Sequence, residues 1–323
     1  LSDKERYITD ELKDMEATIL GAEDKLKSLE YEIFSGIRDE VNNSSVRIRS
    51  SAEALAKLDV FLSLSDVAVQ NGYVCPTVDY SDVVDIKSGR HPVVEKFVDD
   101  AYFVPNDAYL DTSDNTLMLI TGPNMAGKST YMRQTALIIL MAQLGSFVPA
   151  ASARVGIVDK LFTRVGASDD LASGQSTFML EMREVAYILN NATKRSFIVY
   201  DEIGRGTSTY DGMSIARAVA EYTVGRKIGA KTMFATHYHE LTSLEGEIRG
   251  VVNYNVAAKK RGEDVTFLRK IVKGPTDDSY GIEGARLAGV PGEITRRAKE
   301  ILASLEGNRA VSAPKKAAKA QEN

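Results

Sequence analysis

The sequence has few of the residues that cross-link small proteins or bind structural metals. It holds one cysteine, Cys75, and three histidines among 323 residues. A single cysteine excludes a disulfide framework, and so few thiols and imidazoles argue against a structural zinc site. This composition is typical of a protein from a reducing compartment.

Segments that direct a chain to or through a membrane are also missing. Residues 1–6 mix both charges and do not resemble a signal peptide. The longest charge-free run, 134–153, contains Gln143 and Pro149, and its dense apolar part spans only 136–142. Because a membrane-spanning helix needs about 20 apolar residues, we expect this run to form a buried core helix of a soluble protein.

The overall composition is that of a globular protein with a small negative charge. Hydrophobic residues make up 44% of the chain, and 40 basic against 45 acidic side chains leave a net charge of −5. The apolar content excludes a disordered chain. The acidic balance argues against a surface that binds nucleic acid everywhere, although a local basic patch is compatible with it. At about 100–200 residues per domain, the length predicts two domains.

The N-terminal part has the apolar spacing of long helices. From Ile8 to Ile33 apolar residues recur at alternating intervals of four and three. This spacing places them in one stripe along a helix, as in a coiled coil. Asn-Asn-Ser at 42–44 interrupts the pattern, which resumes over 48–62. We therefore expect two long helices within residues 1–75. The spacing leaves a coiled-coil segment and a plain helical bundle as alternatives.

After residue 75 the sequence pattern changes to short runs of residues that favour β-strands. Continuous apolar runs at 116–120, 196–200 and 232–235 predict strands buried on both faces of a mostly parallel sheet. Helical stretches alternate with these strands, and the alternation predicts an α/β domain over 76–290. The expected helices of this domain span 129–144, 179–190 and 212–224.

The C-terminal region, 291–323, differs from the α/β part. A charged amphipathic helix is expected beyond Gly292. It gives way to an Ala/Lys-rich tail over 311–323 that we expect to be disordered. A solvated tail without a ligand is the preferred interpretation of its lysines.

The strongest motif is Gly-x-x-x-x-Gly-Lys-Ser. It follows the predicted strand 116–120 and precedes a helix-forming run, which is the context of a phosphate-binding loop. In such loops backbone N–H groups converge, and the following helix offers its positive end to phosphate. Lys128 is expected to reach the β- and γ-phosphates and the Ser129 hydroxyl to bind Mg²⁺. The candidate nucleotide-binding residues are Gly122, Pro123, Asn124, Met125, Ala126, Gly127, Lys128, Ser129 and Thr130.

A carboxylate pair ends a neighbouring predicted strand. Asp201 and Glu202 directly follow the apolar run 196–200. A nucleotide site of this kind needs a carboxylate for its metal, so Asp201 is the candidate Mg²⁺ ligand. Glu202 is the candidate general base that holds and deprotonates the attacking water.

Two further features favour ATP hydrolysis. The sequence contains no Asn-Lys-x-Asp motif, which usually recognises guanine. Its absence favours ATP over GTP as the nucleotide. His237 follows the strand candidate 232–235 and could contact the γ-phosphate or the attacking water. His239 is interpreted as a polar residue at a strand end, and a metal site shared by the two histidines is not expected.

A turn of small residues precedes the predicted helix 179–190. Ser173-Gly174-Gln175-Ser176-Thr177 would expose N–H and hydroxyl donors at a helix start. It resembles the signature loop with which ABC-type ATPases complete the ATP site of a second subunit. Together with the loop at Gly122 and the carboxylate pair, it suggests a dimer with ATP between the subunits.

These stretches together resemble one family, the MutS DNA mismatch-repair ATPases, and most closely its bacterial branch. The resemblance covers most of residues 79–292 and rests on the order of its motifs. The motifs are TGPNMAGKST at 121–130, GQSTFM at 174–179, DEIGRGTSTYDG at 201–212 and FATHYHEL at 234–241, with GRHPVVE at 89–95, FVPND at 103–107 and SYGI at 279–282.

The resemblance implies a role for each matching residue. It assigns phosphates and Mg²⁺ to Lys128 and Ser129, the metal to Asp201, the hydrolytic water to Glu202 and γ-phosphate sensing to His237. Three further positions complete the implied site. Ser176 would act on the partner's nucleotide, Phe103 would lie against the adenine, and a second base contact would fall near Arg269, where relatives often have histidine.

The resemblance also implies an architecture and partners. It predicts an α/β fold: an ABC-type P-loop ATPase domain with a mostly parallel central sheet over 76–290. A helical lever remnant over 1–75 would precede it, and the start of a helical dimerisation segment over 291–323 would follow. None of the ten phenylalanines has Glu two residues later, so the family's mismatch-reading Phe-x-Glu is missing and we expect a C-terminal fragment. The implied partners are a second copy in a homodimer, mismatched double-stranded DNA in the intact protein and a MutL-type repair protein, in a bacterial cytoplasm at the nucleoid and without a membrane.

Two other functions are compatible with the same motifs. An SMC-like ABC ATPase would use the stripe 8–33 as the root of a coiled coil. A nucleotide-dependent interaction module would bind ATP without hydrolysing it, although Glu202 beside Asp201 argues against this alternative.

Overall fold

The computed structural model describes residues 7–97, 103–123, 126–165, 177–261, 264–275 and 280–312. Its internal contacts divide the chain into two units, one up to Asp66 and one from Val67 onward. In the described part of the chain, no helix is long and apolar enough to cross a membrane.

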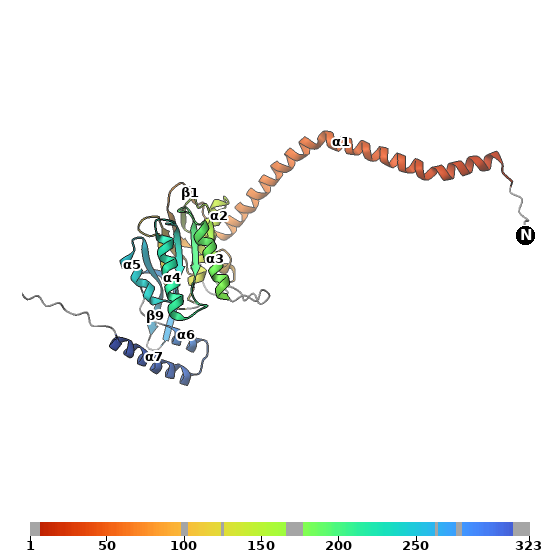
Figure 1. The fold of residues 1–323 in the computed structure, drawn as a ribbon. Coiled ribbons are helices and arrows are strands. Elements are labelled where there is room, and N and C mark those ends of the chain that lie inside the picture. Colours follow the sequence, from red (N-terminus) through yellow and green to blue (C-terminus); the bar gives the residue numbers. More distant parts are fainter. Residues whose placement is uncertain are drawn as a thin grey trace, which may run out of the picture. The chain divides into compact units, whose positions relative to one another are not determined.

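The first unit is part of one long helix. α1 runs without interruption from Asp10 to Asn71 (Figure 1), so the prediction of two helices separated at 42–44 is wrong. Asn and Ser cost a helix interior at most about 0.7 kcal/mol each, and only proline or glycine would cost clearly more. Ala68 is the buried residue of α1, and the apolar stripe that begins at Ile8 is exposed.

The second unit is built on a six-stranded sheet with the order β10-β9-β4-β8-β7-β6. Neighbouring strands run parallel, except that β9 and β10 form an antiparallel pair. This arrangement confirms the predicted α/β class with a mostly parallel sheet. The strands are β4 (Leu117–Thr121), β6 (Leu161–Arg164), β7 (Phe197–Asp201), β8 (Lys231–Ala235), β9 (Val251–Arg261) and β10 (Asp264–Lys273).

The apolar runs of this sheet are continuous because both faces are covered. Successive side chains of a strand point to opposite faces. Met118 and Ile120 of β4 pack into one core cluster with α2 (Lys128–Gln143), whereas Leu117 and Leu119 pack into the other with α3 (Thr177–Asn191) and α4 (Thr209–Val224). All three helices lie within a few residues of their predicted ranges.

A smaller sheet completes the first cluster. Its order is β1-β5-β2-β3, with β1 parallel to β5 and the other pairs antiparallel. The strands are β1 (Thr77–Asp79), β2 (Val84–Gly89), β3 (Asn106–Leu110) and β5 (Ser152–Gly156). Val84 and Ile86 of β2 pack on the face of the large sheet that α2 covers.

Short helices fill the connections and the C-terminal end. They are η1 (Val94–Lys96), η2 (His239–Ser243), α5 (Leu244–Glu247) and α6 (Gly281–Leu287), followed by α7 (Gly292–Ser312). α7 is the helix expected beyond Gly292. It includes the first two residues of the predicted tail, 311–323, and the rest of that tail lies outside the described residues.

Candidate functional site

The loop between β4 and α2 has the geometry that a phosphate-binding loop needs. β4 is fully buried and ends at Thr121, and α2 begins at Lys128. Gly127 precedes α2 with φ of 103°, a left-handed conformation that side chains rarely adopt. Gly122 also has a positive φ, 133°, and a Cβ atom there would lie 3.2 Å from Cγ2 of Val256 in β9, so a side chain at either glycine would be strained. Asn124 and Met125 lie outside the described residues.

Lys128 is the buried cation of this loop. Its side chain is 3% exposed, and its Nζ donates hydrogen bonds to the carbonyls of Gly122 at 2.5 Å and Pro123 at 3.1 Å. The Nζ also lies 3.7 Å from Oε1 of Glu202. Burial lowers the pKa of Lys128, while the carboxylates of Glu202 and Asp201 act in the opposite direction.

The carboxylate pair ends the strand two places away. β7 and β8 run parallel, and Asp201 is paired with Ala235 at their carboxyl ends. Asp201 is 8% exposed, and its Oδ1 has no hydrogen-bond partner among the described residues. Glu202 has a φ of 59°. Its Oε2 lies 2.6 Å from Nη1 of Arg205, with which it forms an ion pair.

His237 follows β8, which lies between β4 and β7. Burial lowers the pKa of His237 to about 4, and the positive charges of Arg205 and Lys128 add to this effect. Its Nδ1 finds no hydrogen-bond partner among the residues that the structure describes. Because β4, β8 and β7 are parallel neighbours, the structure brings the loop, His237 and the carboxylate pair to one edge of the sheet.

A first cavity, of about 260 Å³, lies beside the loop. It is lined by Val94, Phe103, Val104, Asn106, Gly127, Thr130, Tyr131, Gln134 and Arg269. Phe103 and Arg269, the two positions at which the family resemblance implies base contacts, therefore line one cavity with the loop residue Gly127. Their contact with a base stays a prediction.

Asn106 explains how Arg269 reaches this cavity. Arg269 has a φ of 53° and lies where the register of β9 and β10 shifts. The Asn106 side chain donates to the carbonyl of Arg269 at 3.0 Å and accepts from the N–H of Ile271 at 2.8 Å. Sequence reasoning quoted Asn106 within the motif at 103–107 but gave it no role, because the bulge that it stabilises joins segments more than 160 positions apart.

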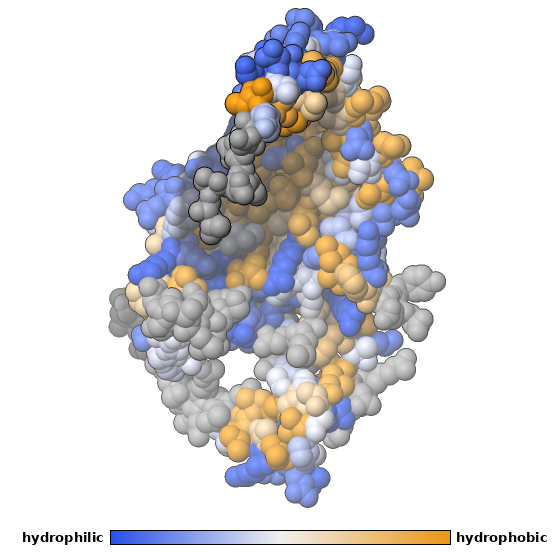
Figure 2. Space-filling model, turned by 90° about the vertical axis from the view of Figure 1, so that its right-hand side faces the viewer, coloured by the Kyte–Doolittle hydropathy of each residue, from blue (hydrophilic) through white to orange (hydrophobic). Residues whose placement is uncertain are grey.

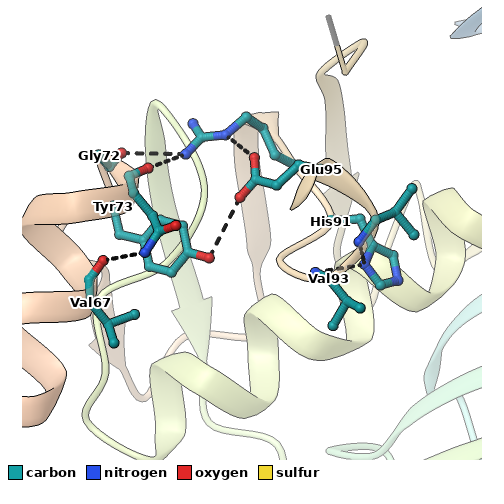
Figure 3. A network of polar contacts seen from close by, with 9 residues as sticks. Val67, Gly72, Tyr73, His91, Val93 and Glu95 are labelled. Atoms are coloured by element: carbon teal, nitrogen blue, oxygen red, sulfur yellow. Dashed lines mark hydrogen bonds and ion pairs between the residues drawn. The ribbon is translucent and has the colours of Figure 1, made fainter. Parts of the chain in front are cut away.

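The wall of the first cavity continues into a polar network at the end of α1 (Figure 3). The Arg90 guanidinium donates to the carbonyls of Asn71 at 2.9 Å and Gly72 at 3.4 Å. Its Nε also donates to Glu95 at 2.7 Å. Glu95 is next to Val94, a lining residue, in η1. Arg90 thereby satisfies carbonyls that the end of a helix leaves open.

A second cavity, of about 370 Å³, opens in front of the carboxylate pair. Three arginines face the acidic groups there, and the sequence analysis had identified none of them. The lining residues are Arg133, Arg164, Thr177, Glu181, Asp201, Glu202, Arg205 and Gly206. The signal for Arg205 was its position in the motif at 201–212, whereas Arg133, Arg164 and Glu181 had no local signal.

The predicted trans-acting residue is not part of this geometry. Ser176 lies outside the described residues, as does the rest of 166–176, and α3 begins at the next residue, Thr177. Among the described residues, no group of three or more His, Cys, Asp or Glu side chains could hold a metal alone.

Comparison with known proteins gives one consistent family. The model of MutS domain V matches residues 118–306. The DNA mismatch repair protein MutS of Acetivibrio thermocellus is 61% identical over 306 residues, which cover 95% of this chain and 35% of that protein. Its namesake from Ruminiclostridium cellulolyticum is 62% identical over 307 residues, with 95% and 35% covered. The chain thus spans about a third of the length of these curated relatives.

Proposed function

The chain belongs to the MutS family, and we propose that it is the part of a DNA mismatch-repair protein that binds and hydrolyses Mg·ATP. The observation that carries this proposal is the meeting of three groups at one sheet edge. Lys128 of the loop lies 3.7 Å from Glu202, and His237 follows β8, the strand that lies between β4 and β7. A buried cation for the phosphates, a carboxylate for the metal and a second carboxylate for the water are parts that phosphoryl transfer to water uses, and His237 adds a neutral hydrogen-bonding group beside them.

The donor set fits Mg²⁺ in the presence of a nucleotide. Mg²⁺ is usually held by one or two protein ligands, with substrate phosphates and water as the others. Asp201 offers a buried Oδ1 without a partner among the described residues, and Ser129 offers its hydroxyl at the start of α2. When bound, the ion would neutralise charge on the phosphate oxygens.

The first cavity is the proposed base site. It adjoins Gly127 and Thr130 of the loop, so a nucleotide whose phosphates lie on the loop can direct its base there. Phe103 supplies an aromatic face, and Arg269 supplies a planar guanidinium that can stack on the other side of a purine.

Glu202 is the proposed general base. Its Oε2 is occupied by an ion pair with Arg205, 2.6 Å away. In the proposed reaction this contact gives way to water, which Glu202 then orients and deprotonates beside the γ-phosphate. His237, neutral near pH 7, would contribute a hydrogen bond rather than a charge.

The wider role follows from the relatives, which are named DNA mismatch repair proteins. We propose that two copies enclose the nucleotides, with Ser176 acting on the partner's site, and that ATP switches the intact protein between states on mismatched DNA with a MutL-type partner. Since the matched family model and relatives are MutS proteins, the SMC-like alternative is left without support. The non-hydrolysing alternative is decided by the experiment below.

The test is the variant Glu202→Gln, which keeps the size of the side chain and removes its basicity. We expect Mg·ATP affinity within about threefold of the unaltered chain and a loss of hydrolysis of about 10²- to 10⁴-fold. Calorimetry measures binding, and phosphate release measures hydrolysis. Glu300→Gln, on the exposed face of α7, is the control and should change neither quantity.

Two results would contradict the proposal. If the unaltered chain takes up no Mg·ATP, the nucleotide site itself is wrong. If Glu202→Gln binds Mg·ATP and hydrolyses it at the original rate, the assignment of the base is wrong.

A further inference from the structure

One acidic side chain of the second cavity comes from α3, a helix that contributes none of the groups assigned to phosphate, metal or water. Glu181 lies on α3 and is 5% exposed. Its Oε1 accepts the N–H of Gly204 at 2.6 Å, and its Oε2 accepts from Arg164 at 3.4 Å. A buried carboxylate is tolerated when both oxygens are satisfied. Glu181 therefore connects α3 to the turn that directly follows Glu202.

Gly204 is held from its other side as well. The hydroxyl of Tyr238 donates to the Gly204 carbonyl at 2.9 Å. Tyr238 is adjacent to His237, and the two ring centroids are 4.4 Å apart. The N–H and the carbonyl of Gly204 are thus each fixed by one side chain, Glu181 from α3 and Tyr238 from the segment after β8.

A second, independent contact joins α3 to the same turn. A Cβ atom on Gly206 would lie 2.8 Å from the Cβ and 3.1 Å from the Cα of Phe178. Gly206 therefore packs directly on the backbone of the first turn of α3. The hydrogen bond at Gly204 and the close packing at Gly206 therefore couple the position of the turn 204–206 to that of α3.

Glu202 itself has a backbone conformation that needs such support. Its φ of 59° is in the left-handed region, which residues with a Cβ occupy only when the surrounding structure holds them there. The Glu202 N–H donates to the Ala235 carbonyl at 3.0 Å. One residue separates Glu202 from Gly204, so the hydrogen bonds at Gly204 fix the other end of this short segment.

We propose that Glu181 and Tyr238 are positioning residues for Glu202: by fixing Gly204 between them, they hold the general base in its strained conformation. They touch neither nucleotide nor water in this role. The inference rests on the proposed function and predicts that α3 controls the rate of hydrolysis while nucleotide affinity is set elsewhere, at the loop and the first cavity.

The experiment compares kcat and KM for ATP across a small set of variants of the 323-residue chain. Glu181→Ala removes the acceptor for Gly204, and we expect kcat to fall about 10- to 100-fold with KM within about twofold, since small misplacements of a catalytic group have effects of this size. Glu181→Gln keeps an acceptor and should retain at least about a third of the original kcat. Tyr238→Phe removes one hydroxyl, keeps the ring and should lower kcat about 3- to 30-fold.

Glu184→Ala is the matched control. Glu184 is on the same helix and lies 3.0 Å from the same Arg164, but it is 44% exposed and has no contact with Gly204 in the structure. Its removal should leave kcat and KM unchanged. If Glu184→Ala lowers kcat as much as Glu181→Ala, the ion pairs of Arg164 and not the bond to Gly204 are responsible, and the proposal fails.

A second measurement, made without nucleotide, tests directly whether the two side chains hold Gly204 in place. Hydrogen exchange of the peptide that contains Gly204 should be faster in Glu181→Ala and Tyr238→Phe and unchanged in Glu184→Ala. Equal exchange in all variants, a rise in KM without a loss of kcat, or a Glu181→Gln variant as slow as Glu181→Ala would each overturn the proposal. If Glu181→Ala does not fold, Tyr238→Phe decides alone by the same criteria.

Failure of the inference and failure of the proposed function give different results. If Glu202→Gln hydrolyses ATP as fast as the unaltered chain, Glu202 is not the general base, and the proposed positioning role of Glu181 and Tyr238 is rejected together with that assignment. If Glu202→Gln is inactive and Glu181→Ala and Tyr238→Phe have the original kcat, the ATPase assignment stands and the positioning role alone is rejected.

Discussion

His237 shows how one side chain can be tuned by its surroundings. Burial is the largest cause of its low pKa of about 4, and two cations of the site, Arg205 and Lys128, act in the same direction. The imidazole is therefore neutral at pH 7, and its Nδ1 has no hydrogen-bond partner among the residues that the structure describes. A neutral imidazole can contact phosphate without adding to the cationic charge that Lys128 already supplies.

The lowered pKa has a consequence for stability. An unfolded histidine titrates near pH 6.5, so between about pH 6.5 and pH 4 the unfolded chain binds more protons at this position than the folded one. The folded state therefore loses free energy of unfolding as the pH falls through this window. Between pH 7 and pH 4.5 the free energy of unfolding should fall by about 1–2 kcal/mol less in His237→Gln than in the unaltered chain. This difference is smaller than a fully buried histidine would give, because His237 is partly exposed to solvent.

Urea unfolding at the two pH values measures this difference. His239→Gln, which changes the other histidine of the same segment, is the control. A loss between pH 7 and pH 4.5 that is equal in His237→Gln and in the unaltered chain would contradict the assigned pKa.

At the scale of elements, the start of α4 packs unusually closely on the turn after β7. A Cβ atom on Gly212, in the first turn of α4, would meet the carbonyl of Gly204 and lie 2.5 Å from the hydroxyl of Tyr238. Two glycines thus let the backbones of the turn and the helix touch. Ser208 caps α4 by accepting from the N–H of Asp211 at 3.4 Å, which fixes the helix at this position.

Gly212→Ala should therefore lower the free energy of unfolding by about 2 kcal/mol or more, since the clash involves a backbone carbonyl that cannot move without Gly204. Gly246→Ala in α5 is the matched control. No atom lies within 4 Å of its added Cβ, so it should be neutral or raise the free energy of unfolding by up to about 1 kcal/mol. Both are measured by urea unfolding, and equal effects would show that the contact of Gly204 and Gly212 is not close in solution.

At the scale of the whole molecule, the two units differ in how much side chain they bury. No described residue of the first unit is buried, and Ala68, the one buried residue of α1, belongs to the second unit. In that unit β4, β7 and β8 are buried throughout. Exposed hydrophobic side chains also occur in the C-terminal region: Figure 2 shows apolar side chains at the lower end of its view, the level of α6 and α7 in Figure 1. Leu287 and Ile294 are exposed there.

A helix without buried contacts depends on its own propensity. Amide hydrogens of residues 10–60 should therefore exchange at least about 100-fold faster than those of β4, β7 and β8, whose opening requires unfolding of the core. Hydrogen exchange followed by mass spectrometry on the whole chain measures this ratio. Protection of 10–60 equal to that of the sheet would mean that the exposed stripe is covered in solution.

The sequence by itself determined the motifs and the elements that carry them. Asp201, Glu202 and His237 were proposed because each follows an apolar run, and Lys128 because it belongs to the Gly-x-x-x-x-Gly-Lys-Ser motif. Both are local signals. The same runs predicted a mostly parallel sheet, since strands buried on both faces have no polar side. The break at 42–44 was the error, because a change in apolar spacing does not stop a helix whose residues tolerate helical geometry.

Only the tertiary structure decided which distant groups meet those motifs. Asn106 reaches the bulge at Arg269, and Glu181 reaches Gly204 from another helix, through hydrogen bonds between segments that no local pattern relates. The pKa of His237 likewise depends on burial and on charges from Lys128 and Arg205. Positions of this kind are set by packing of whole elements, which is why the sequence predicted the chemistry of the site and the fold supplied the contacts that hold it.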